Sequence, residues 1–285
     1  MTTDFHFAAV MYSILVGGGL LYGVRAALKG RARHERVERD GGSVFVGKPF
    51  MEFGYWLMGP VVALADRLGA TPNGVTAFSL LPAAGAGVAV AFGAFGLGCL
   101  LATAAALADI VDGLLARRQG VSSDAGEALD AAVDRYSEFF FMTGLLVYYR
   151  NVLPLLLLSA FVLLGGYMVS YATVKAEALA VPAPRGSMRR SERAVYLFFG
   201  AGFTPLCELL VGPSRPLVVR QAPMVVAIVI VAVVANVSVV RRFHAIITAI
   251  RARERQSGGA AKAGSSVVVD DQRAAPSDGS VGLMQ

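Results

Sequence analysis

The segment from Asp109 to Asp134 places four helically spaced aspartates, at positions 109, 112, 130 and 134, in an otherwise membrane-like sequence, and it constrains the fold more than any other stretch. It reads DIVDGLLARRQGVSSDAGEALDAAVD. At about 100° per residue, Asp109 and Asp112 share one face of a helix, and Asp130 and Asp134 share one face of a second helix. The polar stretch RRQGVSSDA between them is typical of a surface loop. We therefore expect two membrane helices, joined by this loop, to bring four carboxylates together.

Burying these carboxylates in lipid is costly. An acidic side chain at the centre of a membrane helix costs about 2.5–3.5 kcal/mol, so four without partners would cost on the order of 10 kcal/mol, as much as the stability of a whole domain. The group must therefore lie near a membrane surface, in a hydrated cavity or around cations. Hard oxygen ligands suit Mg²⁺, Mn²⁺ or Ca²⁺, and two divalent ions would offset four carboxylate charges. The sequence thus predicts a divalent-metal site.

Three further residues of the segment suit a phosphate-bearing substrate. Gly113 and Gly126 carry no side chain, so a ligand can approach both backbones closely. Arg117 supplies a fixed positive charge whose planar donors match phosphate oxygens.

The composition indicates an integral membrane protein. Of its 285 residues, 55% are hydrophobic and only 16% are charged, and the mean hydropathy is +0.60. The 26 Lys and Arg exceed the 20 Asp and Glu, but they lie at the ends of hydrophobic segments and not in a patch with interleaved aromatics. This pattern orients helices, and no nucleic-acid partner is expected. Cys99 and Cys207 lie in apolar surroundings without metal-ligand spacing and are expected to be packing residues.

Two helices are expected before the core. Residues 5–28 are long enough to span the bilayer, and the basic cluster after them places the N-terminus outside. A cleavable signal peptide is the alternative, but the segment has no basic start and carries Asp4, which favours an uncleaved anchor. Residues 48–69 have helically spaced apolar side chains and are expected to form an interfacial helix. A short spanning helix is the alternative, disfavoured by Glu52 and Pro60.

The sequence Thr71-Pro72-Asn73 is a helix-start signal, and six spanning helices are expected after it. Their approximate ranges are 72–93, 97–117, 126–149, 152–178, 190–211 and 222–247. The turns at one end of this six-helix core contain few basic residues, namely Arg150, Arg215 and Arg220. The other end carries Arg117, Arg118, Lys175, Arg185, Arg189, Arg190, Arg193, Arg241, Arg242, Arg251, Arg253 and Arg255. By the positive-inside rule, the aspartates at this second end face the cytoplasm.

The expected organisation has three parts. Residues 1–44 form the transmembrane anchor and a basic linker, residues 45–250 form the membrane domain, and residues 251–285 form a cytoplasmic tail that is rich in Gly, Ala and Ser and expected to be disordered. Because the anchor and the tail lie outside the part that bears the aspartates, a chain of residues 45–250 is expected to remain active.

The spacing Asp-x2-Asp-Gly-x2-Ala-Arg-x8-Gly-x3-Asp-x3-Asp resembles, at every fixed position, the signature of the CDP-alcohol phosphatidyltransferases. The resemblance implies an all-α membrane enzyme of phospholipid biosynthesis, acting as a homodimer. Its donor is a CDP-linked lipid, usually CDP-diacylglycerol, and the hydroxyl of a small polar alcohol attacks the lipid-side phosphorus to expel CMP. Such an enzyme lies in the inner (cytoplasmic) membrane, in contact with membrane lipids, with its active site facing the cytoplasm.

The resemblance also assigns roles to residues. It implies two Mg²⁺ or Mn²⁺ ions held by Asp109, Asp112, Asp130 and Asp134, and it makes Asp134 the general base. Asp134 lies one turn further along its helix than Asp130, where an acceptor hydroxyl could come between it and the donor phosphate. The residues implied for the CDP-lipid are Thr76, Asp112, Gly113, Ala116, Arg117 and Gly126.

A second set of residues, Ser170, Lys175, Arg190 and Arg193, lies at the predicted inner ends of two later helices. Positive-inside anchoring explains the basic members equally well; the alternative is a pocket for an acceptor that carries its own phosphate. The pattern Ser-Tyr…Ala-Glu followed by Arg-x-x-Arg is similar to the phosphatidylinositol phosphate synthase branch of the family, where such residues hold inositol phosphate. The chain departs from that branch at Thr173, where the branch has a basic residue, and Lys175 is the nearest substitute.

Two other functions remain open at this point. The same site would suit glycerol 3-phosphate or another alcohol as acceptor. A divalent-cation transporter or a metal-stabilised scaffold would also use four acids, although it would not need Gly113, Arg117 and Gly126 at their positions. Helix-terminal charges without function are the remaining alternative.

Overall fold

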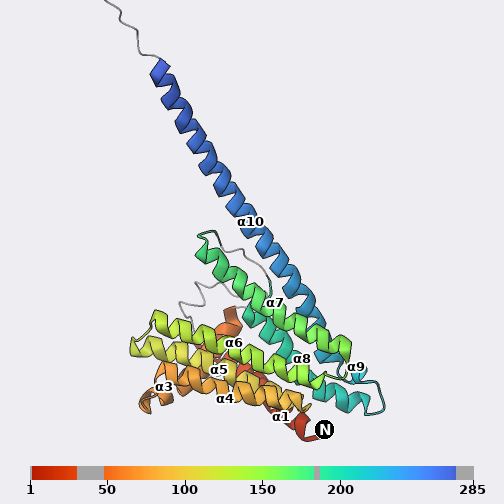
Figure 1. Ribbon diagram of the computed structural model, residues 1–285. Coiled ribbons are helices and arrows are strands. Elements are labelled where there is room, and N and C mark those ends of the chain that lie inside the picture. Colours follow the sequence, from red (N-terminus) through yellow and green to blue (C-terminus); the bar gives the residue numbers. More distant parts are fainter. Residues whose placement is uncertain (1, 31–47, 183–186, 274–285) are drawn as a thin grey trace, which may run out of the picture.

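The computed structural model describes residues 2–30, 48–182 and 187–273, and this part of the chain is helical without strands (Figure 1). The basic residues expected in 31–39, and Arg185, lie outside the described residues. The helices are α1 (Thr2–Lys29), α3 (Lys48–Arg67), α4 (Pro72–Ala91), α5 (Phe95–Gln119), α6 (Asp124–Tyr148), α7 (Leu153–Ala178), α8 (Arg190–Val211), α9 (Leu217–Arg220) and α10 (Ala222–Arg273).

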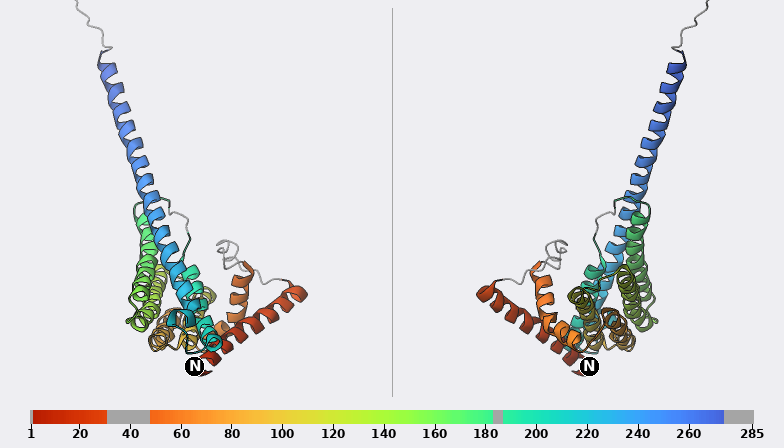
Figure 2. Two further views of the ribbon diagram at one scale, coloured as in Figure 1. Left: turned by 90° about the vertical axis from the view of Figure 1, so that its right-hand side faces the viewer. Right: turned by 90° about the vertical axis from the view of Figure 1, so that its left-hand side faces the viewer.

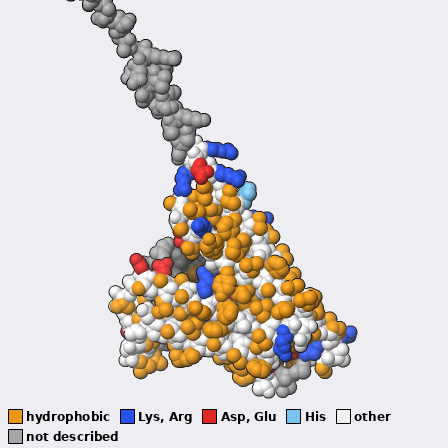
Figure 3. Space-filling model, in the orientation of Figure 1, with side chains coloured by type: hydrophobic (Ala, Val, Ile, Leu, Met, Phe, Trp, Pro, Cys, Tyr) orange, Lys and Arg blue, Asp and Glu red, His pale blue; other side chains and the backbone are white. Residues whose placement is uncertain are grey.

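Six of the described helices are long and apolar enough to cross a membrane, namely α1, α4, α5, α7, α8 and α10. Helix α6 is as long as α5 and lies beside α4 in the same bundle, but its first half is rich in aspartate and glutamate. Hydrophobic side chains cover most of the face seen in Figure 3, and carboxylates gather at the left end of the bundle. The predicted fold class, an all-α integral membrane protein with a six-helix core, is confirmed.

Capping residues fix the ends of the helices that carry the aspartates. Thr71, not Asn73, caps α4, because its Oγ1 accepts a hydrogen bond from the Gly74 N–H at 3.2 Å. Helix α5 continues to Gln119 and ends at Gly120, whose φ of 66° is the left-handed conformation that glycine adopts easily. Ser123 then caps α6. The loop between the two helices is therefore residues 120–123, shorter than the polar stretch suggested.

Helices α4 and α6 approach each other backbone to backbone. A Cβ atom added at Gly87 would overlap the carbonyl oxygen of Phe140, and one added at Gly144 would overlap the carbonyl oxygen of Gly87. Close approach through small residues is a common way for membrane helices to pack. The contact fixes α6, and with it two of the aspartates, relative to the rest of the bundle.

The first helix is joined to the core at the end opposite the aspartates. Asp4 accepts hydrogen bonds from the backbone N–H groups of Gly96 and Leu97, both at 2.9 Å, and so caps the start of α5. Tyr12 stacks on Phe203 of α8 with ring centroids 4.8 Å apart. From this contact α1 diverges from the bundle toward its C-terminal end (Figure 2).

Helix α3 packs along the second half of α5, where Met58 and Val62 meet Val111 and Leu115. At its end, Asp66 forms a 2.8 Å ion pair with Arg118. Helix α3 is not among the candidate spans of the described residues, in agreement with the interfacial helix that was predicted.

The last helix is longer than expected. Helix α10 continues without a break to Arg273 and projects beyond the bundle (Figure 1), so part of the segment that was expected to be a disordered tail is helical. Neither glycine nor alanine interrupts a helix as proline does, and residues 251–273 contain no proline. Residues 274–285 lie outside the described residues.

Candidate active site

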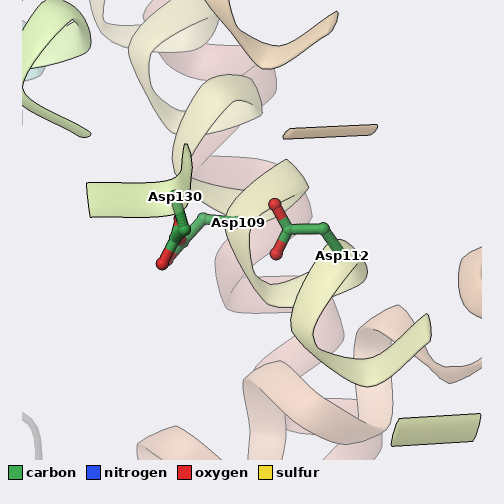
Figure 4. A group of neighbouring side chains, drawn as sticks. All are labelled: Asp109, Asp112 and Asp130. Atoms are coloured by element: carbon green, nitrogen blue, oxygen red, sulfur yellow. The ribbon is translucent and has the colours of Figure 1, made fainter. Parts of the chain in front are cut away.

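Three of the four predicted carboxylates lie together. Asp109 and Asp112 from α5 and Asp130 from α6 each offer an oxygen atom, and these atoms lie within 4.8 Å of one another (Figure 4). The Asp112 side chain is buried, and the other two are half-buried. The i,i+3 spacing on α5 and the short capped loop to α6 together produce this convergence.

The charges of this group are suited to a divalent cation. Two carboxylates at this separation repel each other by roughly 3–4 kcal/mol at an effective dielectric constant of 20, and the group contains three such pairs. Among the described residues, no ion pair includes Asp109, Asp112 or Asp130. Mg²⁺ and Mn²⁺ prefer hard oxygen ligands, and carboxylate oxygens are among them. The residues present therefore fit such an ion.

Thr76 orients one of the three ligands. Its Oγ1 atom lies 2.5 Å from Asp112 Oδ2 and 3.0 Å from the Pro72 carbonyl oxygen. A hydroxyl has one proton to donate, and the shorter, charge-assisted bond to Asp112 takes it. Thr76, near the start of α4, thus contacts one of the three clustered carboxylates directly. The sequence had predicted that Thr76 binds the CDP-lipid.

Asp134 is separated from the three. It lies one turn after Asp130 on α6, and its carboxylate forms an ion pair with Arg190, the first residue of α8. The side chains of Asp134 and Arg190 are 16% and 33% exposed, so solvent and a soluble substrate can reach both. Arg190, predicted to bind the acceptor, therefore stands directly at the predicted general base.

The remaining residues predicted for the CDP-lipid lie around the same end of the bundle. Ala116 follows Asp112 by four residues and lies on the same face of α5, while Gly113 is half-buried and Arg117 is exposed in the last turn. A Cβ atom at Gly126 would lie 3.4 Å from Ser123 Oγ and at an ordinary distance from its other neighbours. Packing alone therefore does not require a glycine at position 126.

The predicted acceptor residues differ in their surroundings. Lys175 is exposed near the end of α7, and the Ser170 hydroxyl donates to the Gly166 carbonyl at 3.3 Å. Arg193 is 1% exposed. Its Nε donates to Glu138 Oε1 and one terminal nitrogen to Oε2, both at 2.8 Å, while the other terminal nitrogen donates to the Met188 carbonyl at 2.8 Å. The guanidinium of Arg193 is thus engaged within the protein.

The sequence did not indicate Arg242. Its side chain is buried and donates to Thr173 Oγ1 at 3.1 Å, so a positive charge from α10 stands beside the position where the sequence lacks a basic residue. Arg241 and Arg242 look like ordinary anchoring residues in the sequence. Only the packing of α10 against α7 shows which of the two points inward.

Comparisons with known proteins point to one enzyme family. Residues 69–237 match the model of the family described as CDP-alcohol phosphatidyltransferase. A phosphatidylinositol phosphate synthase from Streptomyces avermitilis is 32% identical over 252 residues, which are 85% of this chain and 99% of the relative. An archaetidylinositol phosphate synthase from Methanothermobacter thermautotrophicus is 30% identical over 138 residues, which are 48% of this chain and 69% of the relative.

Solved structures of Mycobacterium tuberculosis phosphatidylinositol phosphate synthase have a similar fold. The structure with CDP-DAG bound gives a TM-score of 0.58 at 26% identity and covers 66% of this chain and 92% of its own. The complex with manganese and citrate gives a TM-score of 0.59 at 26% identity, covering 66% and 88%.

Proposed function

The chain belongs to the CDP-alcohol phosphatidyltransferase family, and from this premise we propose that it transfers a phosphatidyl group from CDP-diacylglycerol to inositol phosphate, releasing CMP. The observation that carries the proposal is the group of three carboxylates from α5 and α6, with an arginine-paired fourth beside it. The relatives named as phosphatidylinositol phosphate synthases, and the manganese bound to one of them, support the acceptor and the metal.

In this mechanism Asp109, Asp112 and Asp130 would hold Mg²⁺ or Mn²⁺, and Asp134 would help to hold a second ion. Such metal would supply positive charge that neutralises the diphosphate of the donor, which is the main requirement of phosphoryl-type transfer. Arg117 binds phosphate oxygens at the end of α5. Gly113, Ala116 and Gly126 carry little or no side chain, which leaves room for the nucleotide.

Asp134 removes the proton of the acceptor hydroxyl while that oxygen attacks the lipid-side phosphorus. The bond from this phosphorus to the bridging oxygen breaks, and CMP leaves with the electron pair. Arg190 pairs with Asp134, and from this position it can bind the phosphate of an acceptor that enters between them. A phosphate attracts a guanidinium more strongly than a neutral alcohol does, which favours a phosphorylated acceptor.

Arg242 and Lys175 add positive charge to the acceptor side of the site. Arg242 reaches Thr173 from α10, and the exposed Lys175 lies half a turn further along α7. We assign Ser170 and these two cations to the acceptor pocket. The charge of Arg193 is balanced by Glu138 within the protein, so Arg193 is not assigned to this pocket.

The proposed setting is the cytoplasmic membrane, with the aspartates on the cytoplasmic side and the chain acting as a homodimer. The excess of basic residues at the aspartate end of the bundle supports this orientation. A lipid donor then enters from the bilayer while the nucleotide and the acceptor stay in water.

The experiment is CMP release by purified protein supplied with CDP-diacylglycerol, Mg²⁺ or Mn²⁺, and a panel of inositol phosphate, glycerol 3-phosphate, serine and free inositol. We expect inositol phosphate to give the highest rate and a chelator to abolish it. A faster reaction with glycerol 3-phosphate would show that this compound is the acceptor and would leave the family chemistry unchanged. A faster reaction with serine or free inositol would show that the site has no pocket for an acceptor phosphate. Metal transport without CMP release would show that the protein is a transporter and not an enzyme.

A further inference from the structure

Glu138 belongs to no part of the machinery described so far, yet it connects two elements of the site. It lies four residues after Asp134 on α6, and Arg193 lies three residues after Arg190 on α8, so each pair shares one helical face. The two ion pairs, Asp134 with Arg190 and Glu138 with Arg193, are therefore consecutive links between the same two helices.

These links cross a gap between the helices. Among the described residues, no Cα atom of α6 lies within 8 Å of a Cα atom of α8. Helix α7 leaves room for the Glu138–Arg193 pair at Gly166, where an added Cβ atom would lie 2.5 Å from Glu138 Oε1 and 3.1 Å from Arg193 Nε. The position of α8 over α6 at this end thus depends on side chains, namely the ring contact between Phe141 and Phe198, 5.8 Å between centroids, and the ion pair of Arg193 with Glu138, whose side chains are 1% and 9% exposed.

Arg193 also stabilises the turn at Met188, just before α8 begins at Arg190; we call this turn the corner. Met188 has a φ of 63°, a conformation that costs energy for a residue with a side chain. Its carbonyl oxygen accepts from Arg193 at 2.8 Å, and its N–H donates to Glu192 Oε2 at 2.6 Å. The strained corner is therefore fixed on both sides immediately before Arg190.

We propose that Glu138 is a positioning residue for the transfer reaction: by binding Arg193, it fixes the start of α8 so that Arg190 faces Asp134. The inference rests on the proposed function, because it gives Arg190 its role at the acceptor. It also assigns Arg193 to holding the corner instead of contacting the acceptor.

The test is a double-mutant cycle with Glu138→Gln, Arg190→Gln and both changes, in the full chain. We expect Glu138→Gln to raise the KM for inositol phosphate about tenfold and to leave CDP-lipid binding within about twofold. In the Arg190→Gln background the same change should have no further effect on this KM. Equal effects in both backgrounds would show a general structural role, and an unchanged KM in a folded Glu138→Gln protein would overturn the proposal.

A second readout does not need turnover. Arg190 places a positive charge beside the metal ligands, so its release should tighten Mn²⁺ binding severalfold, as measured by the electron paramagnetic resonance of free Mn²⁺. Glu138→Gln should likewise tighten Mn²⁺ binding severalfold, and it should not change Mn²⁺ affinity further when Arg190→Gln is already present. If the unaltered protein releases no CMP with any acceptor, the proposed function fails, while this cycle still decides the role of Glu138.

Losing one partner of a buried ion pair can prevent folding. The double variant Glu138→Leu/Arg193→Met replaces the pair with apolar side chains of similar volume, which is often tolerated. It should fold, yet show the raised KM and tighter Mn²⁺ binding; wild-type values for both would overturn the proposal. Glu208→Gln is the matched control, because Glu208 pairs with Arg220 at 3.3 Å near the other end of α8. It should leave both quantities unchanged, and a change as large as that of Glu138→Gln would indicate general loosening of α8.

Discussion

Asp134 differs from the other three aspartates in having a cationic partner of its own. We expect Asp134→Asn to fold normally and to keep CDP-lipid binding, because the amide retains the shape of the side chain. CMP release should fall by at least about 100-fold, the lower range for loss of a general base. Single-turnover CMP release and CDP-lipid binding measured on the same preparation separate the two effects. Full CMP release by the variant would show that Asp134 is not the general base.

Thr76 should act through the metal ligand that it contacts. Thr76→Val keeps the shape of the side chain but removes the hydroxyl that donates to Asp112. We expect Mn²⁺ affinity to fall roughly 10-fold to 100-fold, as is typical when a residue that orients a ligand is lost. Equilibrium Mn²⁺ binding measures this, and Thr76→Ser, which keeps the hydroxyl, is the control. Equal affinity in Thr76→Val and the unaltered protein would show that the bond does not orient Asp112 for the metal.

At the scale of single residues, the sequence predicted the convergence of Asp109, Asp112 and Asp130, because helical spacing and a short loop are local properties. It did not predict which charge each arginine meets. Arg190 and Arg193 lie three residues apart, yet one meets Asp134, whose side chain is 16% exposed, and the other meets Glu138, whose side chain is 9% exposed. Such choices depend on how α6, α7 and α8 pack, and no local pattern encodes them.

At the scale of elements, the contact between α4 and α6 is sensitive to a single methyl group. Gly87→Ala would drive a Cβ atom into the Phe140 carbonyl oxygen, so we expect destabilisation by about 1–3 kcal/mol, as in overpacked cores. Thermal unfolding in detergent measures it. Gly85→Ala is the matched control on the same helix, because its Cβ atom would meet only Leu101 Cδ1, at 3.3 Å. Equal unfolding temperatures for the two variants would mean that α4 and α6 can separate at little cost.

The helix boundaries were largely predictable, because apolar runs and capping residues are local signals. The start of α4 at Pro72 follows from Thr71, and the start of α6 is within two residues of the prediction. The short helix α9 lies in a stretch with two prolines that was expected to be a turn. The extension of α10 was missed because its composition resembles that of unfolded segments.

At the scale of the whole molecule, a chain of residues 45–250 keeps every residue assigned to the site. We expect it to remain active, as its sequence suggested, but to unfold at a lower temperature than the full chain. The reason is the loss of α1, with its cap on α5 and its ring contact with α8. CMP release and thermal unfolding of both chains test this prediction. A folded but inactive short chain would mean that the domain limits are misplaced.

The cap that Asp4 provides has a consequence for how the protein is made. Its partners, Gly96 and Leu97, come 92 and 93 residues later in the chain. At about 5–20 residues per second, the ribosome delivers them roughly 5–20 s after Asp4. During that interval the carboxylate has no partner, and hydrocarbon is a costly place for it, so it must wait in water at the membrane surface. We therefore expect the start of α5, when it is synthesised, to meet a carboxylate that already lies at the membrane surface and can accept its free N–H groups.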